Sequence, residues 1–139
     1  MRRFLPAFLL LALACSDGGP EFLGGDGELF FSGALVAEEL LKSHEFDLTS
    51  SGTVQVQLEA VSAVTGDTGE ALEIERITVG LGRPNLESCI ATRSTSLAPG
   101  ESFIVFLSPA TFCVLVSRPL LISVDALIEY TVSVSPALS

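Results

Sequence analysis

The chain has 139 residues, enough for one domain with a substantial core. Its 17 acidic residues outnumber its 7 lysines and arginines, which gives a net charge of -10 at pH 7. Such a chain repels nucleic acid and anionic lipid head groups, so we expect neither as a partner. The acidic residues are spread along the chain, which is typical of a solvated surface rather than of an acidic tail.

The first residues carry the features of an export signal. Arg2 and Arg3 form a short basic region, and an apolar segment follows over residues 4–14. A helix that crosses a bilayer needs about 20 apolar residues, so this segment is too short to span one. A basic start, a short apolar segment and small residues at its end predict a secretory signal peptide.

Cys15 follows the apolar segment directly. The sequence LALAC, residues 11–15, resembles the lipobox of bacterial lipoproteins, in which the cysteine is acylated and becomes the first mature residue. Ala12 stands where leucine is usual, and Ser16 replaces the aspartate that favours inner-membrane retention. We therefore expect a lipid anchor, palmitate among its acyl chains, at Cys15, and with it residence in the outer membrane of a Gram-negative cell envelope. The alternative is an ordinary signal peptide and a secreted protein.

A polar segment separates this signal from the rest of the chain. It is rich in glycine and acidic residues and contains Pro20, a composition that cannot bury enough apolar surface to order itself. We therefore predict three parts: a lipoprotein signal peptide over residues 1–14, a flexible tether over residues 15–27 and a folded domain over residues 28–137.

The folded domain consists of short segments, several of which alternate apolar and polar residues as half-buried strands do. Strands are predicted at residues 29–36, 43–48, 52–61, 75–82, 102–107, 112–116 and 129–134. Residues 102–107 and 112–116 are apolar on both faces, which predicts strands that are covered on both sides or central to the sandwich. Residues 36–43, VAEELLKS, are the one plausible helical turn. Frequent turn signals between the segments predict an all-β, antiparallel sandwich of about eight strands.

The order of these segments resembles the bacterial pre-peptidase C-terminal domain. The opening pattern of that family is matched by Ser43, His44, Phe46, Leu48, Gly52, Val54, Val56 and Leu58. Its closing strand is matched by Tyr130, Val132 and Val134, and a later strand is matched in part by Ala110, Phe112, Val114 and Val116. The resemblance covers residues 29–136 and implies a jelly-roll-like β-sandwich. It also implies an accessory role in secretion, localisation or substrate contact, without catalytic residues.

Cys89 and Cys113 remain as a pair once Cys15 is assigned to the anchor. Exported proteins reach an oxidising compartment, so we predict a disulfide between them; the alternative is two buried free thiols. Neither cysteine belongs to a CxxC motif or has a histidine close to it in sequence, which argues against a zinc site.

Residues with catalytic or metal-binding chemistry are few. His44 is the only histidine, and the alternation places it with Phe46 and Leu48, as expected for a histidine at the edge of the core rather than a general base. Asp67 and Glu70 are candidate calcium ligands because they supply loop carboxylates, but they lack EF-hand spacing, and the alternative is a solvated acidic loop. We expect no catalytic residues and no cofactor.

The sequence therefore predicts a non-enzymatic cell-envelope lipoprotein, held on the membrane at Cys15, whose sandwich binds an envelope protein or a glycan. Leu120, Leu121 and Ile122 are the candidate exposed apolar strip for that partner. The alternative is that these three residues pack on the sandwich as an extra strand or loop. Other possible functions are a structural spacer, a self-associating domain and, less favoured, a hydrolase with a cryptic site.

Overall fold

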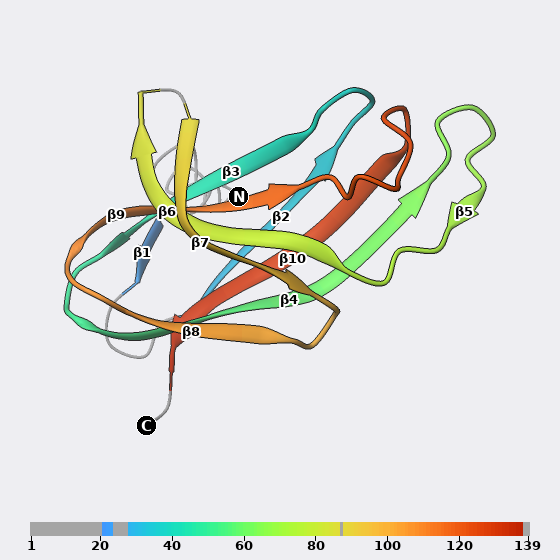
Figure 1. Ribbon diagram of the computed structural model, residues 1–139. Coiled ribbons are helices and arrows are strands. Elements are labelled where there is room, and N and C mark those ends of the chain that lie inside the picture. The colour runs from blue at the N-terminus through green and yellow to red at the C-terminus, as the bar shows by residue number, and fades with distance from the viewer. Residues whose placement is uncertain (1–20, 24–27, 87, 138–139) are drawn as a thin grey trace, which may run out of the picture.

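A computed structural model of the chain describes residues 21–23, 28–86 and 88–137 (Figure 1). Every secondary-structure element in these residues is a β-strand, and the strands form two sheets. None of the described residues forms a helix that could cross a membrane. Sheet I has the order β1 (Glu21–Leu23), β3 (Leu41–Leu48), β9 (Ala110–Ser117), β6 (Ile77–Asn85), β7 (Ser88–Leu97). Sheet II contains β2 (Leu29–Leu35), β10 (Leu127–Pro136) and β4 (Gly52–Val64), with β8 (Ser102–Leu107) and β5 (Ala71–Leu72) both paired to β4.

The eight longer strands define the topology. Across the sheets, the order β2-β10-β4-β8 faces the order β3-β9-β6-β7, so most consecutive strands lie in opposite sheets. This is the strand order of a jelly roll, and all pairs among the eight strands are antiparallel. The predicted fold class, an antiparallel jelly-roll-like sandwich of about eight strands, is confirmed.

The core lies between the two sheets and follows the alternation in the sequence. In β4, Val54, Val56 and Leu58 are buried, whereas the glutamines between them are half-buried. In β10, Tyr130 and Val132 are buried in the same core. Burying one such apolar side chain contributes about 1.5–3 kcal/mol, so the period-two pattern fixes which face of each strand turns inward.

Strand β8 shows where the sequence prediction of double coverage is wrong. Its segment, residues 102–107, is apolar throughout, but Ile104 and Phe106 are 50% and 66% exposed. The reason is that the outer face of sheet II has no further layer in the part of the chain that the structure describes. The second such segment, residues 112–116, lies in β9 between β3 and β6 and is largely buried.

Three local features differ from the sequence predictions. Residues 36–43, the candidate helical turn, form a turn and the start of β3. Glu21–Leu23, inside the predicted tether, pair with β3 as a parallel strand, because the edge of β3 offers unpaired backbone groups. Strand β7 was not predicted, since its side chains are mostly polar and exposed and show no alternation. The predicted signal peptide, Cys15 and the rest of the predicted tether lie outside the described residues.

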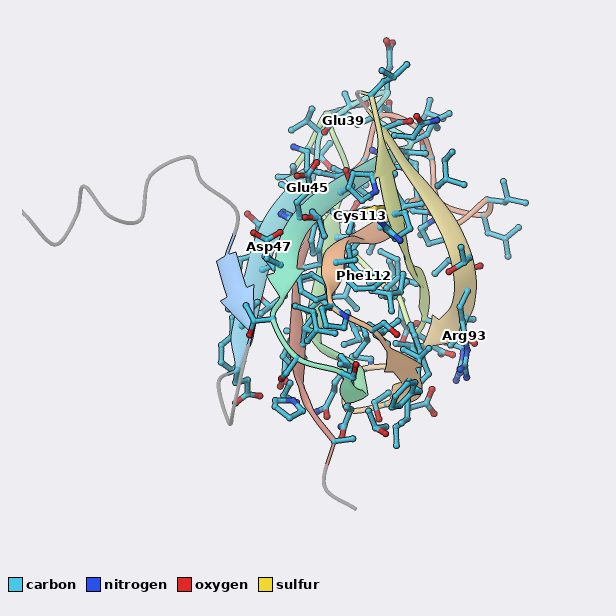
Figure 2. All side chains as sticks on the ribbon, turned by 90° about the vertical axis from the view of Figure 1, so that its left-hand side faces the viewer. Glu39, Glu45, Asp47, Arg93, Phe112 and Cys113 are labelled. Carbon is cyan, nitrogen blue, oxygen red and sulfur yellow. A yellow bond between two sulfur atoms is a disulfide. The ribbon has the colours of Figure 1, made fainter. Side chains whose placement is uncertain are left out.

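The predicted disulfide is formed between Cys89 in β7 and Cys113 in β9 (Figure 2). Strand β6 separates these two strands in the sheet order, and strands two apart in a flat sheet lie about 9.5 Å from each other. The two Cα atoms are only 6.0 Å apart, so the β6–β7 hairpin curls over β9. Gly82 permits this close approach, because a Cβ atom added there would lie 1.8 Å from the carbonyl oxygen of Ile90.

Candidate docking surface

Two loops meet at one end of the sandwich, the β2–β3 loop (residues 36–40) and the β9–β10 loop (residues 118–126) (Figure 1). The amide of Glu38 donates a hydrogen bond to the carbonyl oxygen of Val124 at 2.6 Å. This bond joins the loops although they are far apart in sequence. The opposite end of the sandwich carries the β6–β7 turn, because β6 runs antiparallel to β9.

A buried arginine fixes both loops. Arg118 is only 7% exposed, and its guanidinium donates hydrogen bonds of 2.7 to 3.4 Å to backbone carbonyl oxygens from both sides. The acceptors are the carbonyls of Leu35, Val36, Glu39, Ser123 and Ala126. Arginine is rarely this buried unless its donors are satisfied, and its planar fork reaches several acceptors at once. These hydrogen bonds therefore hold the β9–β10 loop in one conformation.

These loops expose apolar side chains. Leu120 and Leu121 are 99% and 97% exposed, whereas Ile122 is half-buried and packs against the core. Two residues of the predicted apolar strip are thus exposed, and the third packs on the sandwich. We call the exposed apolar side chains of both loops and of the first residue of β3 the apolar end: Val36, Leu40, Leu41, Leu120, Leu121 and Val124.

Carboxylates surround the apolar end. Leu121 lies between two shallow hollows, one lined by Glu73, Glu75 and Arg76 and the other by Asp67 and Asp125. Arg76 is paired with Glu101 at 2.7 Å. The four acidic residues that line the hollows are exposed, so the apolar end has a rim of negative charge.

The β2–β3 loop carries a further carboxylate, that of Glu39, which is paired with a lysine. The amide of Val36 donates to Glu39 Oε1 at 3.0 Å, and this hydrogen bond, with smaller effects of Lys42 and Arg118, lowers the pKa of Glu39. Lys42 Nζ lies 3.5 Å from Glu39 Oε2, so the charge of this lysine is compensated by its neighbour. The apolar end therefore offers no free cluster of positive charge among the described residues.

The candidate calcium ligands lie in the exposed turn between β4 and β5. The amide of Glu70 donates to Thr65 Oγ1 at 3.0 Å, and the amide of Gly69 donates to the Thr65 carbonyl at 3.1 Å, so the turn is closed by its own hydrogen bonds. The structure brings neither Asp67 nor Glu70 into a set of three or more metal-ligating side chains within the residues it describes. Calcium binding therefore gains no support from the geometry.

His44 lies on the inner face of β3, as the alternation predicts. Its Nε2 is 2.7 Å from Tyr130 Oη, and its ring stacks on Phe31 with centroids 5.2 Å apart. Partial burial, with a smaller effect of the Lys42 charge, lowers the pKa of His44 and so favours the neutral imidazole. Gly33 makes room for the pair, because a Cβ atom added there would lie 2.6 Å from Tyr130 Oη. The arrangement is a satisfied histidine at the core edge.

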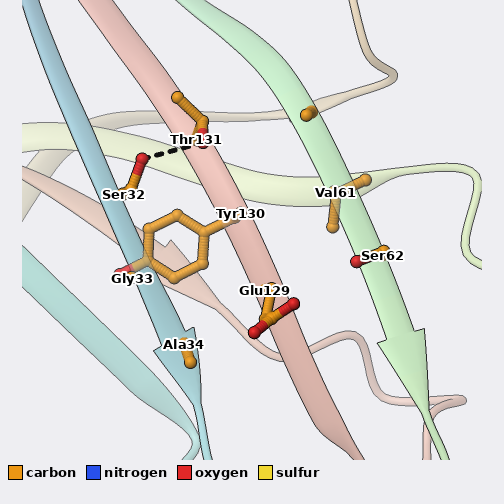
Figure 3. Close-up of a pocket in the computed structure, with 9 residues that line it drawn as sticks. Ser32, Gly33, Ala34, Val61, Ser62, Glu129, Tyr130 and Thr131 are labelled. Atoms are coloured by element: carbon orange, nitrogen blue, oxygen red, sulfur yellow. Dashed lines mark hydrogen bonds between the residues drawn. The ribbon is translucent and has the colours of Figure 1, made fainter.

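A shallow hollow lies on the outer face of sheet II, where β2, β10 and β4 run side by side (Figure 3). Small side chains line most of it, and Ser32 Oγ is 2.9 Å from Thr131 Oγ1. Glu129 is the carboxylate of its lining, and no histidine, cysteine or lysine belongs to that lining. Among the described residues, no hydrogen bond joins Glu129 to a hydroxyl group of this lining.

Comparison with known proteins finds similar solved structures at low sequence identity. No protein-family model and no curated protein matches it. The chain is similar to the solved pre-peptidase C-terminal domain of collagenase from Bacillus anthracis, with a TM-score of 0.45 and 11% identity over 86% of this chain and 98% of that chain. It is also similar to a structure of the disulfide-linked pili of Bacillus endospore appendages, with a TM-score of 0.33 and 13% identity over 83% of this chain and 88% of that chain. Neither likeness assigns a role to any residue.

Proposed function

We propose that this chain is a lipid-anchored, non-catalytic module of the cell envelope that docks through its apolar end. The observation that carries the proposal is the exposure of Leu120 and Leu121 on a loop that the buried Arg118 holds in place. Exposed apolar surface of this kind typically marks an interaction site. Covering one such leucine contributes about 1.5–3 kcal/mol, which a purely structural spacer would leave unused.

Two features support a location outside the cytoplasm. Disulfides persist in oxidising compartments, and Cys89 and Cys113 form one. The basic and apolar start of the sequence matches the pattern of an export signal. In the proposed mature protein, Cys15 carries the lipid, and two or more acyl chains are needed to hold a protein stably on a bilayer.

The described residues also support a role without catalysis. His44, the single histidine of the chain, bonds to Tyr130 and faces inward. The hollow on sheet II brings Glu129 together with small side chains, and its lining contains no histidine, cysteine or lysine. A module that acts only by docking requires neither a histidine free to act as a base nor a carboxylate paired with a nucleophile.

Metabolic labelling with palmitate tests the anchor. We expect the wild-type chain to incorporate label, and Cys15→Ala to lose the label and accumulate as the uncleaved precursor. The paired variant Cys89→Ala, Cys113→Ala is the matched control, because it removes cysteines without touching the lipobox, and it should keep the label. Continued labelling of Cys15→Ala would show that this cysteine is not the anchor.

A further inference from the structure

We infer that the apolar end lies against the lipid bilayer on which the chain is anchored, with Leu120 and Leu121 inserted between the lipids. This inference rests on the proposed function, since it takes the anchor at Cys15 as its premise. It concerns a different property, the orientation of the sandwich on the membrane.

The direction of β1 supports this orientation. Glu21 pairs with Phe46 and Leu23 pairs with Leu48 in a parallel ladder. Strand β3 begins with Leu41 at the apolar end and runs away from it, so Glu21 is the residue of β1 nearest that end. Leu41 and Phe46 are five positions apart, a distance of about 17 Å along the strand.

The chain between the anchor and β1 has a matching length. Residues 15–20 number six, and six residues reach at most about 20 Å. An acyl group on Cys15 is therefore within reach of the level of Leu41 and the apolar end. A connection of only six residues keeps the local concentration of the apolar end at the bilayer surface high, which favours its contact with lipid.

The charge around the apolar end selects the kind of lipid. Its rim is mainly acidic, and the nearby cations Lys42 and Arg76 are paired with Glu39 and Glu101, so anionic head groups are repelled and the contact is made by apolar side chains. A zwitterionic bilayer lacks this repulsion and still buries the leucines. The expected surface is therefore zwitterionic lipid, entered by the rigid β9–β10 loop.

Tryptophan fluorescence offers a direct test, because the chain has no tryptophan of its own. We would reconstitute the full chain in phosphatidylcholine vesicles with brominated acyl chains, as Leu121→Trp or as Leu86→Trp. Leu86 is a matched control, since it is also a leucine, is also 97% exposed, and lies in the β6–β7 turn at the opposite end. We expect the lipid bromines to quench the emission of Leu121→Trp severalfold more than that of Leu86→Trp, and added phosphatidylglycerol to weaken the difference.

The other outcomes overturn the inference. Emission of Leu121→Trp that an aqueous quencher reaches as readily as it reaches Leu86→Trp would place the apolar end in water. Emission shielded from both quenchers would mean that a protein, either a second copy or another partner, covers it. Equal lipid quenching of both variants would mean that no end is preferred. The mass of the N-terminal peptide, measured on the same sample, decides separately whether Cys15 is acylated.

Discussion

Replacing Arg118 should loosen the apolar end and destabilise the whole domain. Methionine keeps much of the volume of the side chain but removes all its donors. Of the five carbonyl bonds, those to Leu35 and Ala126 are buried. A buried carbonyl without a donor costs about 1–3 kcal/mol, whereas the three partly buried carbonyls regain bonds to water. Because removing the buried charge also removes its desolvation cost, we expect Arg118→Met to lower the free energy of unfolding by about 2–4 kcal/mol.

Urea unfolding measures this loss, and amide hydrogen exchange at Glu38 reports whether the two loops separate locally. Arg118→Lys tests whether the positive charge alone is sufficient. Lysine keeps the charge, but its compact ammonium group cannot reach the carbonyls of both loops, so this variant should recover only a small part of the lost stability. Arg83→Met is the control, because Arg83 is exposed and donates to the Thr111 carbonyl alone among its described hydrogen bonds. It should cost less than about 1 kcal/mol. An Arg118→Lys variant as stable as the wild type would refute the reasoning.

Two further predictions concern the disulfide and the single tyrosine. The paired variant Cys89→Ser, Cys113→Ser should lose about 3 kcal/mol of unfolding free energy, since the bridge closes a loop of about 25 residues; an unchanged urea midpoint would contradict this. Burial, with a smaller effect of the Glu39 charge, raises the pKa of Tyr130 to about 12. An unfolded tyrosine ionises near pH 10, so above that pH the unfolded state binds fewer protons, and stability should fall by about 2–3 kcal/mol between pH 10 and 12. Phenolate absorbance reports Tyr130 alone, because the chain has one tyrosine; a midpoint near 10 in the folded chain would rule this out, and Tyr130→Phe should lose the pH dependence.

The sequence predicts most of the fold because burial is periodic in strands. In β4 the valines alternate with glutamines, and a one-residue shift would expose the whole apolar set, so the pattern determines the inward face. Strand β7 escapes such reasoning, since its outward serines and threonines bury little on either face and its position depends on pairing with β6. The prediction for β8 was wrong for a related reason. An apolar segment shows which side chains can be buried, but it does not show whether a further layer of the protein covers the outer face of the sheet.

The apolar end was predicted only in part. Leu120 and Leu121 stand out as an apolar pair after a proline, which a linear pattern can show. Val36 and Leu40 do not, because they lie in the β2–β3 loop and meet the β9–β10 loop only through the jelly-roll connections. Arg118 gave no signal at all, since its partners are backbone carbonyls, which every residue possesses and no sequence pattern marks.

The place of β10 in sheet II also sets the order in which the domain can assemble. Strand β10 lies between β2 and β4, so β2 cannot pair within sheet II until residues 127–136 are available. Pairing over such a separation requires a large loop to close first, which makes folding slow and leaves earlier segments without a stable sheet. A chain built in this way cannot complete sheet II until β10 is present to join β2 to β4.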